Sequence, residues 1–147
     1  MHQKHRIINT AIKLLRRDLR EPGQAMTSSA TVKNYYYLKT TTLEHETFNV
    51  MFLDAQHRLI ADETLFTGTI NAASVYPREI VKRALALNSA AVILSHNHPS
   101  GVSEPSPADK AITTKISQAL ALIDVNVLDH FIVGHDDVLS FSERGWV

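Results

Sequence analysis

Two histidines, a serine and an aspartate lie close together in the stretch "LSHNHPSGVSEPSPAD", residues 94–109. One residue separates His96 from His98, so in an extended chain both imidazoles point to the same face. The proline and glycine that follow favour a turn, which can bring Asp109 back toward the same point. Imidazole and carboxylate groups are common zinc ligands, and three protein ligands leave a fourth tetrahedral position for water. The spacing therefore predicts a zinc site of the catalytic type.

Ser106 and Asp109 also fit a structural role at the start of a helix. The letters "SPAD" are the pattern of a capping box, with Pro107 at the first helical position. The two interpretations are compatible, because a helix that begins here fixes the backbone that aims both side chains. A His-x-His pair alone is a weak signal, whereas these four residue types at fixed offsets are hard to assemble by chance.

The elements around this stretch are expected to place it at one edge of a sheet. The apolar run "AAVILSH", residues 90–96, is typical of a buried strand. Pro77 opens a helix before that strand, and a second helix follows over residues 106–123. Residues 125–134 and 138–143 predict a closing hairpin. The apolar faces of the two helices are predicted at Ile80, Ala84 and Leu87 and at Ile112, Ile116 and Leu120.

Earlier in the chain, the alternation in "TFNVMFLD" predicts a strand over residues 47–54, and residues 59–70 return as one or two strands. The tyrosine-rich stretch of residues 27–40 fits either a short helix or a strand. In the helical interpretation, Ser28 or Ser29 caps a helix with Val32, Tyr35 and Tyr36 on one face. Strands mixed with helices predict an α/β or α+β fold, in which helices cover a sheet.

Composition limits the classes of function. The chain has 147 residues, enough for one domain with a hydrophobic core, and its formal net charge is 0. It has no cysteine, which excludes disulfides and cysteine-ligated zinc and fits a reducing cytoplasm. No apolar run approaches the roughly 20 residues of a membrane span, and no signal peptide is visible. We therefore expect a bacterial cytoplasmic protein without a membrane partner.

The charge is concentrated at the N-terminus. Residues 1–20 contain six basic residues against one acidic residue, a net charge of +5. Ile8, Ile12, Leu15 and Leu19 recur there at helical spacing, and "EPG" at residues 21–23 is a stop signal. Residues 1–24 are thus interpreted as an amphipathic basic helix that packs on a domain of residues 25–147. The helix could instead be a phosphate-contacting arm or the remnant of a larger module.

The stretch "HNHPSGVSEPSPAD" resembles the JAMM metal-binding motif of JAB/MPN domains, and the fuller pattern is similar to the bacterial RadC family. The likeness extends through residues 65–101 and through "VLDHFIVG" at residues 127–134, and covers the chain from about residue 25 onward. It is strongest to short prophage-borne members without the helix-hairpin-helix region of longer RadC proteins. The fold that this resemblance implies is a curved mixed β-sheet flanked by helices, similar to cytidine deaminases.

The resemblance also implies roles for particular residues. His96, His98 and Asp109 would bind one zinc ion per chain, and Ser106 would stabilise a tetrahedral intermediate. A glutamate at the start of a strand would be the general acid and base. Glu46 is the first choice because it precedes the strand at residue 47, and its competitors are Glu44 and Glu63. The implied activity is zinc-dependent hydrolysis of a peptide or isopeptide bond, with a protein or peptide as substrate.

Two other classes of function stay open. RadC proteins are often labelled as DNA-repair proteins, so the chain could be a nucleic-acid-binding or repair accessory protein that uses its basic helix. The neutral net charge counts against this alternative. A non-catalytic scaffold would leave the four motif residues unexplained. Of the remaining histidines, His130 is interpreted as a packing residue, with a supporting contact to a metal ligand as the alternative; the others, which are expected to be solvated, are His2, His5, His45, His57 and His135.

Overall fold

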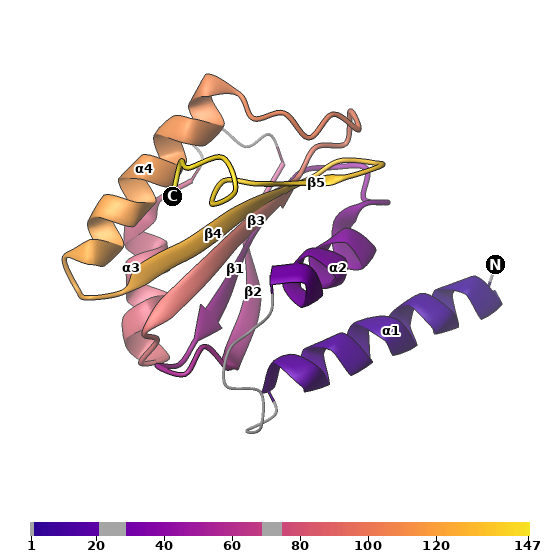
Figure 1. The fold of residues 1–147 in the computed structure, drawn as a ribbon, viewed down its shortest axis with the longest axis horizontal. Coiled ribbons are helices and arrows are strands. Elements are labelled where there is room, and N and C mark those ends of the chain that lie inside the picture. The colour runs from indigo at the N-terminus through magenta and orange to yellow at the C-terminus, as the bar shows by residue number, and fades with distance from the viewer. Residues whose placement is uncertain (1, 21–28, 69–74) are drawn as a thin grey trace.

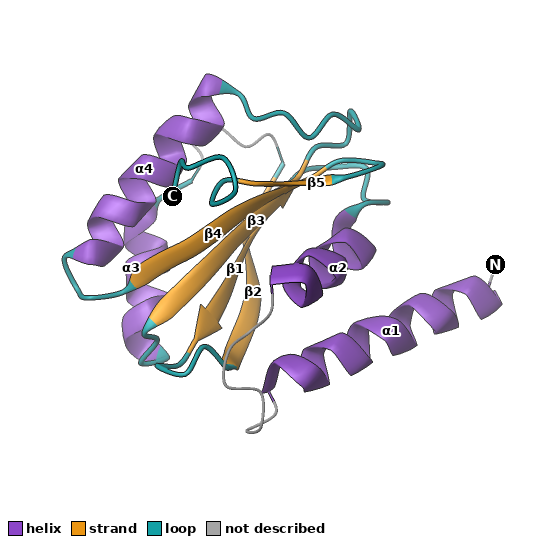
Figure 2. Ribbon diagram, in the orientation of Figure 1, coloured by secondary structure: helices purple, strands orange, loops and turns teal. Residues whose placement is uncertain are grey.

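A five-stranded mixed sheet with helices on both faces forms the fold in the computed structural model, which describes residues 2–20, 29–68 and 75–147 (Figures 1 and 2). The order of strands across the sheet is β2-β1-β3-β4-β5. β3 and β4 run parallel, and the other neighbours are antiparallel. The helices are α1 (His2–Arg20), α2 (Ser29–Thr40), α3 (Pro77–Ala86) and α4 (Pro107–Ala121). The strands are β1 (Thr47–Leu53), β2 (Leu59–Thr67), β3 (Ala91–Asn97), β4 (Asn126–Val133) and β5 (Val138–Ser140). The predicted mixture of helices and strands is confirmed.

One face of the sheet packs against α3 and α4. The expected apolar faces of these helices are buried at Ile80, Ala84, Ile112, Ile116 and Leu120, while Leu87 is half-buried beside them. Their partners in the sheet are Phe48, Val50, Phe52, Val92 and Leu94. Removing this apolar area from water stabilises the layer, at about 25 cal/mol per Å². The layer fixes α4 relative to β3, the two elements that carry the motif.

The opposite face packs against α2, with α1 outermost (Figure 1). The helical interpretation of the tyrosine-rich stretch is confirmed, because α2 buries Val32, Tyr35 and Tyr36 against the sheet. Ser28, one of its two candidate caps, lies outside the described residues. β1 is buried at all seven positions, since it is central and covered on both faces. β2 is one strand, and residues 69 and 70 of the predicted segment lie outside the described residues.

A buried carboxylate joins α1, α2 and β2. Asp62 accepts hydrogen bonds from the hydroxyls of Tyr35 and Tyr36, and Lys39 Nζ lies 2.6 Å from its Oδ2 atom. Arg16 extends the network by donating to the Tyr35 hydroxyl at 2.9 Å. Burial, together with the nearby Asp62 charge, raises the pKa of Tyr35 above its ordinary value. Arg16 and the apolar residue Leu19 thus hold α1 against the rest of the fold.

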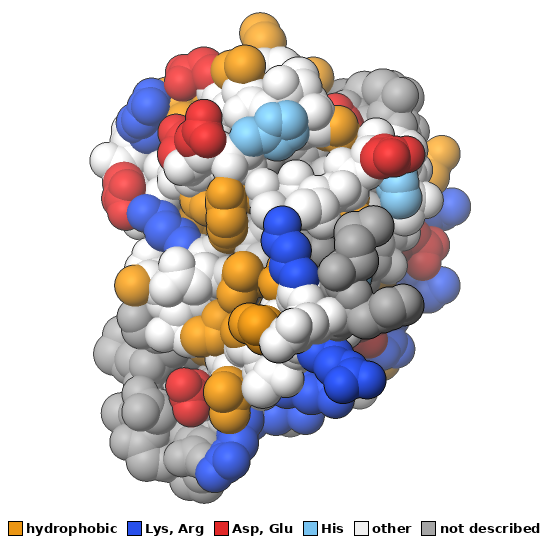
Figure 3. Space-filling model, turned by 90° about the vertical axis from the view of Figure 1, so that its right-hand side faces the viewer, with side chains coloured by type: hydrophobic (Ala, Val, Ile, Leu, Met, Phe, Trp, Pro, Cys, Tyr) orange, Lys and Arg blue, Asp and Glu red, His pale blue; other side chains and the backbone are white. Residues whose placement is uncertain are grey.

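The outer side of α1 carries both charge and apolar groups. Lys4, Arg6, Lys13, Arg17 and Arg20 are exposed on it, as are Ile7 and Leu14. Figure 3 shows Lys and Arg side chains beside hydrophobic ones on this side of the molecule. Among the described residues, no helix is both long enough and apolar enough to cross a membrane.

Candidate metal centre

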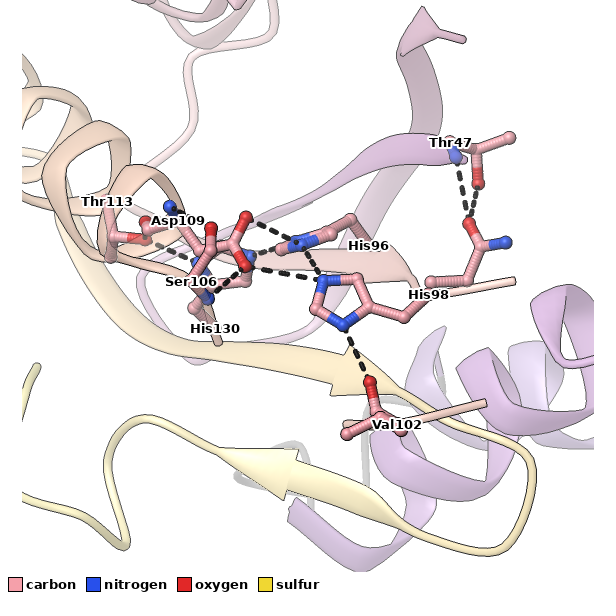
Figure 4. A network of polar contacts seen from close by, with 9 residues as sticks. Thr47, His96, His98, Val102, Ser106, Asp109, Thr113 and His130 are labelled. Atoms are coloured by element: carbon pink, nitrogen blue, oxygen red, sulfur yellow. Dashed lines mark hydrogen bonds and ion pairs between the residues drawn. The ribbon is translucent and has the colours of Figure 1, made fainter. Parts of the chain in front are cut away.

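Three structural elements bring the motif residues together. His96 is the penultimate residue of β3, His98 follows that strand directly, and Asp109 lies in the first turn of α4 (Figure 4). His96 and Asp109 are buried, and His98 is half-buried. Among the described residues these three form a group whose potential ligand atoms all lie within 4.8 Å of one another. The convergence expected from the His-x-His spacing and the turn is therefore present.

The spacing of the ligand atoms matches the geometry of zinc. His96 Nε2 lies 3.0 Å from His98 Nε2 and 3.1 Å from Asp109 Oδ1, and His98 Nε2 lies 3.3 Å from Asp109 Oδ2. A tetrahedron whose corners lie about 2.0 Å from its centre, as nitrogen and oxygen ligands do from zinc, has edges of about 3.3 Å. The residues present thus fit a tetrahedral divalent cation with one corner left for another ligand.

A capping box orients the carboxylate. Ser106 Oγ accepts a hydrogen bond from the backbone N–H of Asp109, and the backbone N–H of Ser106 donates to Asp109 Oδ2 at 2.8 Å. Pro107 is the first helical residue, as predicted. The structural interpretation of "SPAD" is confirmed, and the cap that begins α4 also points the carboxylate at the two imidazoles.

The turn after β3 orients His98. The Nδ1 atom of His98 lies 2.8 Å from the carbonyl oxygen of Val102, so Nδ1 carries the proton. The Nε2 lone pair of His98 is then directed at the ligand atoms of His96 and Asp109. Gly101 makes this turn possible, since its φ of 91° lies in the left-handed region. A Cβ atom at this position would come within 2.5 Å of His135 Nδ1.

A second chain of hydrogen bonds orients His96. The Thr113 hydroxyl donates to the carbonyl oxygen of Asp109 at 2.7 Å, and its oxygen lies 2.6 Å from His130 Nδ1. His130 Nε2 in turn lies 2.8 Å from His96 Nδ1. Because the Thr113 proton is already given to a carbonyl, His130 donates from Nδ1 and accepts at Nε2. His96 is therefore protonated at Nδ1, and its Nε2 lone pair is directed at the group.

The electrostatics of the centre follow from this packing. Burial alone would raise the pKa of Asp109, but His96 and His98, when protonated, donate hydrogen bonds to it and add positive charge, and these effects hold that pKa well below its ordinary value. The hydrogen bond to Asp109 raises the pKa of His98, against the effect of burial. Burial lowers the pKa of His130 well below its ordinary value, with His96 adding to the effect, so His130 is neutral. The centre thus combines an ionised carboxylate with imidazoles held in fixed tautomers.

The three candidate glutamates lie in different places. Glu63 is paired with Arg83 by two hydrogen bonds of 2.8 and 2.6 Å, which removes it from consideration as a base. Glu46 precedes β1 and shares a pocket of about 410 Å³ with Glu44, Pro99 and Ser100. Phe48 pairs with His96, so the antiparallel register continued by two residues puts Glu46 opposite His98. The charge of Glu46 also contributes to the raised pKa of His98. Position therefore favours Glu46 over Glu44.

Comparison with known proteins gives the family. A family model described as a RadC-like JAB domain matches residues 26–146. The chain belongs to the RadC family. The UPF0758 protein YkfG of Escherichia coli is 53% identical to this RadC-family chain over 143 residues, which cover 97% of this chain and 90% of YkfG.

Longer relatives share the same region. A UPF0758 protein of Methylibium petroleiphilum is 63% identical over 118 residues, which cover 80% of the RadC-family chain and 53% of that protein. A UPF0758 protein of Vibrio cholerae is 58% identical over 125 residues, covering 85% and 56% respectively. The RadC-family chain thus spans about half the length of these two curated relatives.

His130 combines the two roles that its sequence position allowed. It packs as favoured, stacking on Phe141 with a centroid distance of 4.6 Å, and it also makes the hydrogen bond that orients His96 in this RadC-family chain. The mainly apolar stretch "LDHFIVG" is the signal for the second role, because a buried imidazole needs a polar partner. Of the other histidines, His5, His45 and His135 are exposed, His57 is half-buried in a turn, and the side chain of His2 lies outside the described residues.

Proposed function

We propose that this chain is a zinc-dependent hydrolase that cleaves a peptide or isopeptide amide bond. The observation that carries the proposal is the triangle of ligand atoms formed by His96, His98 and Asp109, at separations of 3.0, 3.1 and 3.3 Å. Three protein ligands with a vacant tetrahedral corner are typical of catalytic zinc, whereas structural zinc is usually closed by four protein ligands. Zinc bound there would lower the pKa of a water from about 15.7 toward about 7 and would polarise a carbonyl group.

The chain's own residues supply the proton transfers. Glu46, which lines the pocket with Pro99 and Ser100 and raises the pKa of His98 by its charge, accepts a proton from the attacking water and later delivers it to the leaving amine. Glu44 lines the same pocket and is the remaining competitor for this role. The Ser106 hydroxyl donates a hydrogen bond to the oxygen on which negative charge develops. Ser106 can do this because its cap contact uses only a lone pair of Oγ, and the side chain is exposed.

The test combines metal analysis with a peptidase screen. We expect one zinc ion per chain and a chelator-sensitive hydrolysis of peptide or isopeptide substrates. Glu46→Gln should lower the rate by about 10²–10⁴-fold while zinc stays bound. Glu63→Gln is the matched control. Because the Glu63 carboxylate is paired with Arg83, this substitution should leave the rate unchanged. An active Glu46→Gln variant with an inactive Glu44→Gln variant would transfer the role to Glu44. A protein that binds no zinc would refute the hydrolase and favour a scaffold.

The exposed basic residues of α1 support a second candidate, an accessory protein that contacts nucleic acid or a repair protein. Phosphate contacts would make DNA affinity fall steeply with salt concentration. The variants suited to this test are Lys13→Gln, Arg17→Gln and Arg20→Gln, which change exposed side chains. Arg16 is unsuitable because it contacts Tyr35. DNA affinity that is weak, independent of salt and unchanged in the triple variant would exclude this candidate.

A further inference from the structure

Asn97 lies between two candidate zinc ligands in the sequence, yet its side chain forms hydrogen bonds with a distant part of the chain. It is the last residue of β3 and only 2% exposed. Because side chains alternate along a strand, its amide points to the opposite face of the sheet from His96. The group it reaches is the segment of residues 45–47, which leads into β1.

The Asn97 amide bonds to the peptide groups on both sides of Glu46. Its Oδ1 atom accepts hydrogen bonds from the backbone N–H of Thr47 at 2.8 Å and from the Thr47 hydroxyl at 2.9 Å. Its Nδ2 atom donates to the carbonyl oxygen of His45 at 2.9 Å. One side chain thus fixes the backbone immediately before and immediately after the candidate base.

The remaining contacts complete this clamp on Glu46. The carbonyl oxygen of Glu46 accepts a hydrogen bond from the backbone N–H of Gly68 at 2.9 Å, so the segment is tied to β2 as well. The Thr47 hydroxyl accepts from Asn49 Nδ2 at 3.1 Å. The segment therefore has little freedom to move relative to the end of β3.

We propose that Asn97 is a positioning residue that holds Glu46 at a fixed distance from the metal ligands. This inference rests on the proposed function and names a device within that site. Since Asn97 is covalently flanked by His96 and His98, the backbone that aims both imidazoles also carries the amide that aims the base. A displacement of about 1 Å between a base and its target can lower a rate by about 100-fold. Holding Glu46 and the imidazoles from one backbone segment prevents such a displacement.

The chemistry of the amide explains why this position is asparagine. The segment offers a backbone donor at Thr47 and a backbone acceptor at His45, and an amide side chain supplies both complements at once. Asn97→Asp keeps the acceptor but loses the donor to His45. Asn97→Ala loses all three bonds and leaves the buried Thr47 N–H and the His45 carbonyl oxygen without these partners.

The test measures two affinities on the full chain. The first is for zinc, by competition with a chromophoric chelator. The second is the affinity of the zinc-loaded protein for acetohydroxamic acid, whose oxygens bind zinc and whose acidic proton passes to an adjacent base. We expect Asn97→Ala to weaken hydroxamate binding by about tenfold, as Glu46→Gln does, while zinc affinity changes by less than about threefold. The double variant should bind hydroxamate no more weakly than Glu46→Gln alone, because both changes remove the same contact.

Asn49→Ala is the matched control. Asn49 is a fully buried asparagine of the same hydrogen-bond network, but it contacts Thr47 only at the hydroxyl. We expect it to lower stability with little effect on hydroxamate affinity. If Asn97→Ala does not fold, Asn97→Asp replaces it, with a smaller loss of hydroxamate affinity expected.

The outcomes separate the two proposals. Additive losses in the double variant, or a loss of zinc affinity as large as the loss of hydroxamate affinity, would show that Asn97 does not act through Glu46. Hydroxamate affinity that falls in Glu46→Gln but not in either Asn97 variant would overturn the positioning role alone. If the wild-type protein binds zinc but Glu46→Gln leaves hydroxamate affinity unchanged, the proposed base is overturned, and the positioning role with it.

Discussion

The Nδ1 atom of His96 lies 2.8 Å from the Nε2 atom of His130, and both rings are fully buried. The two side chains sit diagonally on adjacent parallel strands, β3 and β4. This contact fixes which nitrogen of His96 carries the proton, and so determines which nitrogen is available to a metal. A residue far from the motif in sequence therefore controls the chemical state of one candidate ligand.

Replacing His130 tests this control. His130→Phe keeps a ring of similar size between His96 and Phe141 but removes the acceptor, so zinc affinity should fall by about 10–100-fold. Thr113→Val, which interrupts the same chain one bond further away, should give a smaller loss in the same direction. Chelator competition measures both values, with the exposed His5→Gln as control. Unchanged zinc affinity in His130→Phe would show that the orientation of His96 does not depend on its hydrogen bond to His130.

The capping box allows helix stability to be separated from metal binding. Ser106→Ala removes the cap to the backbone N–H of Asp109 and should cost about 1 kcal/mol of stability, while zinc still binds. Asp109→Asn retains an oxygen for the backbone but loses the negative charge, so zinc binding should be lost. Urea unfolding and metal analysis on the same samples check both expectations. Stoichiometric zinc in Asp109→Asn would remove the carboxylate from the ligand set.

Stability of the zinc-free protein should depend on pH through His98. Its pKa is raised by Asp109, so this pair contributes fully below the unfolded pKa of about 6.5, and the contribution declines as pH rises through the folded pKa. The melting temperature should therefore fall between about pH 6 and pH 8, and His98→Gln should reduce that fall. Added zinc should have the opposite dependence, because it binds the neutral imidazole. A wild-type melting curve that is independent of pH in this range would contradict the pairing.

At low pH, the lowered pKa of Asp109 makes the stability of the protein change with pH in the opposite direction. Its contribution is complete above the unfolded pKa of about 3.9 and is lost as pH falls through the folded value. Asp109→Asn should therefore flatten the acid limb of the stability profile. Urea midpoints measured across this range check the expectation, and an acid limb identical to that of the wild type would exclude Asp109 as its source.

The buried network around Asp62 should govern how firmly α1 is attached. Tyr35→Phe removes a hydrogen bond to a buried carboxylate and leaves Arg16 without its hydroxyl partner, at a cost of about 1–3 kcal/mol. Hydrogen exchange should then show faster opening of α1 than of the sheet. Tyr76→Phe, at a half-exposed tyrosine outside this network, is the control and should change neither measurement. Equal protection of α1 in both variants would mean that its apolar contacts suffice.

Much of the fold could be predicted because its signals are local. The capping residues of α4, the proline that opens α3 and the apolar run of β3 each depend on neighbours in sequence. The convergence of His96, His98 and Asp109 was predictable for the same reason, since fourteen positions in one strand-turn-helix segment contain all three residues. Short-range periodicity also separated the buried faces of the helices correctly.

The remaining parts depend on pairing between distant strands. Glu46 lies opposite His98 only because β1 pairs antiparallel with β3 in one register, and His130 reaches His96 only because β4 pairs in parallel with β3. No local pattern fixes such a register, since one alternation fits several alignments. The Asn97 amide was overlooked for the same reason: its partners lie 50 and 52 residues away.

The alternation of His96, Asn97 and His98 across β3 limits how this segment can vary between related proteins. Inserting or deleting a single residue within the strand would turn every following side chain over. Both imidazoles would then face α2, and the amide would project into the cation site. Length variation is therefore expected only in the loops that flank the strand.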